Sequence, residues 1–144
     1  MYETDENMVV AAPTGAGKTV IAELAMLRLL LNKKNNNRAD TKIIYISPIK
    51  ALCNERYQDW KRKFNLLKFN VEQYTGDTNY SLSVLNQCDI VIVTPEKFDS
   101  LTRRWNNNTV LLDSISLIII DEVHILNESR GACLEGLISR CKMM

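Results

Sequence analysis

Two short segments carry residues whose type and spacing could bind a nucleoside triphosphate, and the first is a glycine-rich turn. Residues 12–19 read Ala-Pro-Thr-Gly-Ala-Gly-Lys-Thr, the phosphate-binding (Walker A) pattern with alanine in place of its first glycine. Gly15 and Gly17 allow the backbone to turn its N–H groups toward phosphate oxygens. We expect Lys18 to reach the β- and γ-phosphates of ATP and the Thr19 hydroxyl to bind Mg²⁺. The rest of the expected nucleotide cradle is Pro13, Thr14, Gly15, Ala16 and Gly17.

The second segment is a pair of carboxylates that follows a run of aliphatic residues. Residues 117–120 read Leu-Ile-Ile-Ile and lead directly into Asp121 and Glu122. Asp121 could hold Mg²⁺ through a water molecule, and Glu122 could polarise the attacking water as a general base. An acidic pair after a strand is a weak signal alone, but it follows a phosphate loop about a hundred residues upstream. The two segments together predict nucleotide hydrolysis, with Lys18 and Glu122 as the catalytic side chains.

Short apolar segments alternate with longer helical ones along the chain. The expected strands cover residues 8–12, 42–47, 70–74, 89–94 and 117–120. The expected helices cover residues 18–31, 50–64, 97–104 and 131–144, and the polar run 32–40 is expected to be a loop. Leu52, Trp60 and Phe64 are the expected core contacts of the second helix. Strands that are apolar on both faces predict an α/β fold with a mostly parallel sheet, helices on both faces, and ligands at the carboxyl ends of the strands.

Composition limits the class of protein. The chain has 144 residues, 46% of them hydrophobic, and a net charge of +1, which suits one globular domain without a broad basic surface. The four cysteines form no CxxC pair, so we expect reduced thiols and neither a zinc site nor a disulfide framework. No apolar run reaches membrane-spanning length, and we expect a soluble, intracellular protein with no membrane partner.

With these motifs in place, the sequence resembles the superfamily 2 DExH-box helicases. Residues 12–19 and 121–124 resemble motifs I and II; the other matching stretches are 47–52 (motif Ia), 74–77 (the TGD element), 94–98 (motif Ib) and 130–135. The resemblance covers nearly the whole chain and implies a RecA-like P-loop NTPase lobe that uses ATP and Mg²⁺. His124, which ends the DExH box, is then expected to couple the nucleotide site to the nucleic-acid site; the alternative is a semi-buried structural histidine.

The intermediate motifs predict a nucleic-acid contact along one edge of the sheet. Each motif ends a strand, where free backbone N–H groups and threonine hydroxyls could bind successive phosphates of a single strand without reading bases. The expected contact residues are Pro48, Thr75, Gly76, Thr94 and Pro95, with Lys50 and Lys97 adding charge. Each turn by itself is an ordinary strand end, and three of them on one edge favour the binding interpretation.

Two stretches narrow the resemblance within the superfamily. Residues 51–60 and 101–105 are similar to the meiotic crossover DNA helicase (Mer-three/Hfm-one) group. That group implies a nuclear, ATP-dependent helicase that moves 3′ to 5′ on single-stranded or branched DNA during meiotic recombination. An RNA helicase of the spliceosomal or exosome type remains open, as does a non-catalytic P-loop module. Small kinases and GTPases fit less well because they lack the Asp-Glu-x-His segment.

The family pattern extends beyond this chain. Residues 1–144 lack the upstream adenine-reading element, motif III and the second RecA-like lobe with its arginine finger. We therefore expect an incomplete first lobe, either a fragment or a truncated gene model, whose partner in the full-length parent is the second lobe. Because such an arginine accelerates phosphoryl transfer strongly, we expect weak nucleotide binding, negligible hydrolysis and no unwinding from this chain alone.

Overall fold

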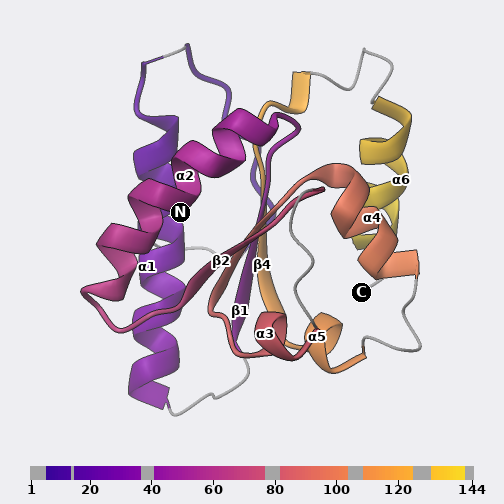
Figure 1. Ribbon diagram of the computed structural model, residues 1–144. Coiled ribbons are helices and arrows are strands. Elements are labelled where there is room, and N and C mark those ends of the chain that lie inside the picture. The colour runs from indigo at the N-terminus through magenta and orange to yellow at the C-terminus, as the bar shows by residue number, and fades with distance from the viewer. Residues whose placement is uncertain are drawn as a thin grey trace. The chain divides into compact units, whose positions relative to one another are not determined.

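A computed structural model of the protein describes residues 6–13, 15–36, 41–76, 82–103, 109–124 and 131–141. The chain falls into two compact units, Met1–Thr41 and Lys42–Met144. The first unit holds the glycine-rich loop and one long helix. The second holds the sheet and the remaining helices (Figure 1).

In the first unit, helix α1 (Lys18–Asn36) follows the glycine-rich loop directly. The helix is longer than predicted, because the expected loop at 32–40 contributes residues 32–36 to it. Lysine is a good helix former, and Lys33 Nζ donates a 3.2 Å hydrogen bond to the carbonyl oxygen of Thr41, beyond the end of the helix. Among the side chains of α1 that the structure describes, Met26 and Leu30 are buried.

The predicted strand at 8–12 is wrong for this structure. Residues 8–12 have no regular structure, and Met8 and Val9 are 51% and 91% exposed. A strand exists only where a neighbour accepts and donates its backbone hydrogen bonds, and every strand of the described sheet lies in the second unit. The aliphatic composition of residues 8–12 favours a strand, but composition does not provide the neighbouring strand with which it must pair.

The second unit is built on a sheet of four parallel strands in the order β2-β3-β1-β4 (Figure 1). The strands are β1 (Lys42–Ile46), β2 (Val71–Tyr74), β3 (Ile90–Val93) and β4 (Ile115–Ile120). Ile46, the last residue of β1, is in register with Val93 of β3 and with Ile120 of β4. The carboxyl ends of the strands therefore meet at one edge, where the predicted motifs begin.

One face of this sheet is covered by helix α2 (Lys50–Asn65), which contacts β2 and β3. Trp60 and Phe64 are buried as predicted, whereas Leu52 is only half-buried and Cys53 takes the inward position. The reason is helical periodicity: Cys53, Trp60 and Phe64 are separated by seven and four residues and share one face, which Leu52 does not.

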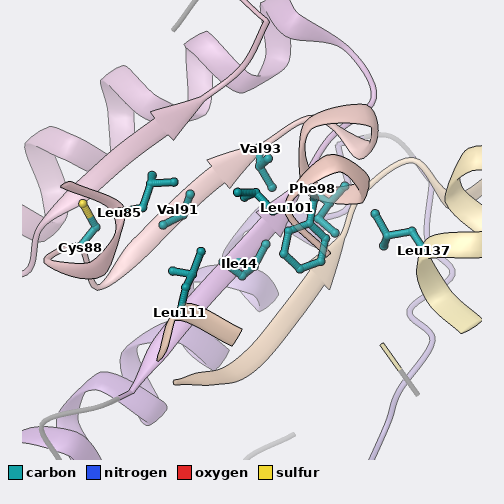
Figure 2. Close-up of a cluster of buried hydrophobic side chains, with 10 residues drawn as sticks. Ile44, Leu85, Cys88, Val91, Val93, Phe98, Leu101, Leu111 and Leu137 are labelled. Atoms are coloured by element: carbon teal, nitrogen blue, oxygen red, sulfur yellow. The ribbon is translucent and has the colours of Figure 1, made fainter. Parts of the chain in front are cut away.

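The other face is covered by four helices. They are α3 (Leu82–Asn86), α4 (Pro95–Arg103), α5 (Thr109–Asp113) and α6 (Gly131–Cys141). Figure 2 shows Phe98, Leu101 and Leu137 packing toward the strand side chains, a cluster that also contains Ile44, Leu85, Val91, Val93 and Leu111. The predicted parallel α/β fold with helices on both faces is confirmed. Helices α3 and α5 were not predicted, because five residues are too few to show a helical period.

Candidate functional site

The glycine-rich loop of the first unit depends on two positive φ angles. Gly15 and Gly17 both have φ of +83°, a conformation that L side chains adopt rarely. A Cβ built on either residue meets no atom within 4 Å, so the backbone conformation, and not lack of space, requires glycine at both positions. The Gly17 carbonyl then accepts hydrogen bonds from the N–H groups of Val20 and Ile21, which begins helix α1.

The Lys18 side chain folds back over this loop. Its ammonium donates hydrogen bonds to the carbonyl oxygens of Ala12 (2.7 Å) and Pro13 (3.0 Å). The Ala16 N–H also donates to the Pro13 carbonyl, at 3.2 Å. The cation expected to contact phosphates is thus held inside the loop by backbone oxygens. Thr19 is half-buried in the first turn of α1, and Thr14 lies outside the described residues.

In the second unit, the Asp121 carboxylate is fixed at the end of β4. The Asp121 N–H donates to the Ile46 carbonyl at 2.9 Å, which continues the β1–β4 ladder by one bond. The Tyr45 hydroxyl donates to Asp121 Oδ2 at 2.5 Å, and the Glu122 N–H donates to Oδ1 at 3.0 Å. Burial first, and the hydrogen bond to Asp121 second, raise the pKa of Tyr45 above its usual value, so its hydroxyl remains a donor.

The next residue, Glu122, has φ of +55°, in the left-handed region that non-glycine residues seldom occupy. Such a residue carries a strain of about 1–3 kcal/mol, and residues of this kind cluster at functional sites. Glu122 Oε2 lies 3.2 Å from Nδ1 of His124. The His124 side chain is 74% exposed, which contradicts the alternative of a semi-buried structural histidine.

The nucleic-acid residues predicted from the strand ends do lie on one edge of the sheet. Pro48 follows β1, Thr75 and Gly76 follow β2, and Thr94 and Pro95 follow β3. Because all four strands are parallel, this is also the edge that carries Asp121. Pro95 also begins helix α4, a position that suits the fixed φ of proline.

Two lysines lie along this edge. The Lys50 Nζ comes so close to Gly76 that a Cβ built there would be 3.1 Å from it. Lys50 therefore extends from the end of β1 past β3 to the end of β2. The Lys97 ammonium lies 5.1 Å from the centroid of the Tyr74 ring, a cation–π contact at the end of the same strand.

The hydroxyl groups of this edge are less accessible than its lysines. Thr75 and Thr94 are 3% and 4% exposed, and Ser47 is fully buried. The Thr94 carbonyl accepts the Phe98 N–H at 3.0 Å in the first turn of α4. Gly76 and Lys50 are exposed and offer the accessible surface of the edge.

The side chains present fit a magnesium ion that arrives with a nucleotide. Within the described part of the chain, no group of three or more His, Cys, Asp or Glu residues could hold a metal by itself. Mg²⁺ is usually bound by one or two carboxylates together with substrate phosphates and water. Asp121, with both oxygens oriented by the hydrogen bonds described above, meets that requirement.

The cysteines have no part in this site. All four are free, and burial raises the pKa of Cys53 and of Cys88 to about 11, so these thiols stay protonated. Cys53 Sγ donates to the Ser47 carbonyl at 3.4 Å, behind the end of β1. Considering only the residues that the structure describes, no helix is long and apolar enough to cross a membrane.

Sequence reasoning missed two features of the site. The first is the contact of Tyr45 with Asp121, since the sequence predicts only that Tyr45 lies in a strand. The tyrosine hydroxyl in an otherwise aliphatic run could have indicated a polar contact at this position. The second is the left-handed backbone of Glu122, which the sequence does not indicate, because glycine or asparagine is the residue expected in that conformation. The Asp77, Trp105 and Arg130 positions of the family motifs lie outside the described residues.

A parallel sheet, a loop with two positive-φ glycines before a helix, and an acidic pair directly after strand β4 define a RecA-like P-loop NTPase lobe. The chain belongs to the DEAD/DEAH box helicase family, whose model matches residues 1–144.

Comparison with individual proteins agrees with this family. The chain is 50% identical over 141 residues to "Probable ATP-dependent DNA helicase HFM1" of Xenopus tropicalis, covering 96% of the chain and 10% of that protein. It is 43% identical over 145 residues to "ATP-dependent DNA helicase MER3" of Saccharomyces cerevisiae, covering 100% of the chain and 12% of that protein. The fold is similar to the crystal structure of the DUF1998 helicase MrfA, with a TM-score of 0.75 at 23% identity, over 92% of this chain and 21% of that one. The chain thus spans about a tenth of the length of these two curated relatives.

Proposed function

We propose that this chain is the ATP- and single-strand-binding first lobe of an ATP-dependent DNA helicase. The observation that carries the proposal is the fixed carboxylate of Asp121, at the strand edge where the nucleic-acid motifs end. The positive-φ loop before α1 supplies the phosphate-binding half.

Each side chain then has a defined task. Lys18 exchanges the Ala12 and Pro13 carbonyls for the β- and γ-phosphates of ATP, since both partners are oxygen acceptors for one ammonium. Thr19 and Asp121 would hold Mg²⁺, which supplies charge neutralisation at the phosphates when it is bound. Glu122 accepts a proton from the attacking water, and His124 contacts the carboxylate that does so.

The strand track follows from the same edge. The Gly76 N–H and the N–H groups that follow Pro48 and Pro95 contact successive phosphates, and Lys50 and Lys97 neutralise them. Contacts of this kind position a strand without reading its bases, as a translocating enzyme requires. Relatives named as ATP-dependent DNA helicases support DNA as the substrate. From the resemblance of residues 51–60 and 101–105 to the meiotic crossover helicases, we further propose 3′ to 5′ movement on single-stranded or branched DNA, in the nucleus, during meiotic recombination.

The chain spans only about a tenth of the length of these two relatives, which supports the proposal that it belongs to a longer protein. We propose that residues 1–144 are one part of a longer helicase whose second lobe supplies the arginine for phosphoryl transfer. Turnover and unwinding belong to that longer protein. This chain alone binds nucleotide weakly.

The test uses Glu122→Gln in the longer helicase. We expect this variant to retain ATP binding while turnover falls by about a thousandfold or more, since the base is lost and the fold is kept. Normal hydrolysis by Glu122→Gln would refute the general-base assignment. Competition between single-stranded DNA and RNA of the same sequence then tests the substrate: preference for RNA would favour an RNA helicase of the spliceosomal or exosome type.

A further inference from the structure

Asp121 is attached to strand β1 twice, once through its backbone and once through its side chain. The backbone bond to the Ile46 carbonyl continues the sheet ladder, as any residue except proline could do at this position. The side-chain bond comes from the Tyr45 hydroxyl, at 2.5 Å from Oδ2. This second attachment depends on the Tyr45 hydroxyl and is therefore particular to Tyr45.

The Tyr45 ring is itself held firmly. It is 3% exposed and lies on β1, which has β3 on one side and β4 on the other. The Trp60 ring contacts it edge-on, with centroids 4.7 Å apart and planes at 79°, and Phe64 contacts Trp60 in the same manner at 6.4 Å. The hydroxyl that reaches Asp121 is therefore placed by the core and not by a mobile surface group.

The hydrogen bonds leave Asp121 with a defined orientation and spare acceptor capacity. Oδ2 accepts from Tyr45 and Oδ1 accepts from the Glu122 N–H, which fixes the plane of the carboxylate. Each carboxylate oxygen accepts more than one hydrogen bond, so each keeps a lone pair for another partner. Mg²⁺ demands near-ideal octahedral geometry, so a carboxylate held in one plane binds its hydration shell better than a rotating one.

We propose that Tyr45 is a positioning residue for the metal-facing carboxylate of Asp121 and thereby sets the affinity of the site for Mg²⁺ bound to nucleotide. The inference rests on the proposed function, which assigns Asp121 to Mg²⁺. It adds a residue that contacts neither the metal nor the nucleotide. Groups that orient metal-binding carboxylates from behind act in this way in other proteins, and their loss weakens metal binding.

The experiment is the substitution Tyr45→Phe, which removes the hydroxyl and keeps the ring against Trp60. Binding of a fluorescent ATP analogue to the 144-residue chain is titrated with Mg²⁺ and then repeated in EDTA. We expect the apparent Mg²⁺ affinity to fall by about tenfold, with metal-free nucleotide binding unchanged. A purely structural role would weaken both equally, and that outcome would overturn the proposal.

A matched control is available on the neighbouring helix. Tyr57 also has a hydrogen-bonded hydroxyl, which contacts Lys61 and Glu72 instead of Asp121. Tyr57→Phe should leave the Mg²⁺ titration as it is in the unsubstituted chain. Equal Mg²⁺ affinities for Tyr45→Phe and Tyr57→Phe would contradict the proposal.

The failure of this inference differs from failure of the proposed function. If nucleotide binding to the unsubstituted chain is independent of Mg²⁺, the assignment of Asp121 is lost and the inference with it. If binding depends on Mg²⁺ and Tyr45→Phe changes nothing, only the part assigned to Tyr45 is wrong. A double-substitution cycle with Asp121→Asn adds a second criterion: Tyr45→Phe should have no further effect once the carboxylate is gone.

A measurement on the unsubstituted chain covers the case in which Tyr45→Phe does not fold. With ¹³C-labelled tyrosine, the Cζ signal of Tyr45 reports on its hydroxyl. We expect that signal to shift when Mg²⁺ is added to the nucleotide complex, while the Tyr57 signal stays in place. An unmoved Tyr45 signal under conditions in which Mg²⁺ binds would contradict the inference.

Discussion

Nδ1 of His124 lies 3.2 Å from Oε2 of Glu122, and both side chains follow the left-handed turn at the end of β4. The contact joins the proposed general base to a side chain that is 74% exposed. A group that touches the base and also faces the surface is well placed to report what is bound outside the nucleotide site.

We therefore predict that His124→Ala uncouples the two sites. In the longer helicase, ATP binding and the basal ATPase rate should change little, while stimulation by single-stranded DNA falls by about tenfold, the size typical of coupling between sites. Steady-state ATPase assays with and without DNA measure both quantities. Val123→Ala is the control, because Val123 is a neighbouring residue that is 40% exposed and has no assigned task. Equal loss of basal and stimulated rates in His124→Ala would count against coupling.

The conformation of the phosphate loop gives a second prediction. Gly17→Ala should weaken nucleotide binding by about tenfold, because an L side chain at φ of +83° costs about 1–2 kcal/mol and the loop relaxes away from the required shape. The effect should come from backbone strain alone, since the new methyl group meets no atom within 4 Å.

The control for this substitution is Gly136→Ala in helix α6. A Cβ at Gly136 also meets no atom within 4 Å, but there the backbone is helical. Alanine should leave nucleotide binding unchanged and raise the free energy of unfolding by about 1 kcal/mol. If Gly17→Ala left nucleotide binding unchanged, as Gly136→Ala should, the positive φ of Gly17 would not be needed for nucleotide binding.

A third prediction concerns the packing of α4 against α6. Asp99 of α4 is 8% exposed and forms ion pairs with two arginines, Arg103 in its own helix and Arg140 in α6. The Arg140 side chain is 33% exposed and the Arg103 side chain 70%. Arg140→Ala should lower the free energy of unfolding by about 2 kcal/mol, because it leaves a buried carboxylate with less compensation.

Arg103→Ala is the matched comparison, since it removes the same side chain from the same carboxylate on the solvent side. It should cost less than about 1 kcal/mol, as exposed ion pairs do. Urea unfolding followed by circular dichroism measures both. If both substitutions lowered the free energy of unfolding equally, the burial of an ion pair would not determine its contribution to stability.

The sequence predicted the second unit well, for physical reasons. Three of its four strands were predicted from aliphatic runs such as residues 90–93, which are buried on both faces and need no alternation. Proline and glycine at strand ends marked their limits, and parallel pairing then placed Pro48, Thr75 and Thr94 on one edge. These predictions depend on local composition and on one topological rule.

What the sequence did not predict depends on partners. Residues 8–12 have the composition of a strand but no ladder in this structure. The contact between Tyr45 and Asp121 joins residues 76 positions apart, and it arises from the register of β1 with β4, which no local pattern contains. The left-handed conformation of Glu122 is set by its surroundings and not by its own preference.

The central claim is that the chain binds ATP together with Mg²⁺, with Lys18 at the phosphates and Asp121 at the metal. Titration of the chain with a fluorescent ATP analogue, with Mg²⁺ and in EDTA, tests it through Lys18→Ala and Asp121→Asn. We predict that Lys18→Ala weakens binding under both conditions and that Asp121→Asn removes only the gain in affinity due to Mg²⁺. A gain from Mg²⁺ that is as large in Asp121→Asn as in the unsubstituted chain would contradict the assignment of Asp121 to Mg²⁺.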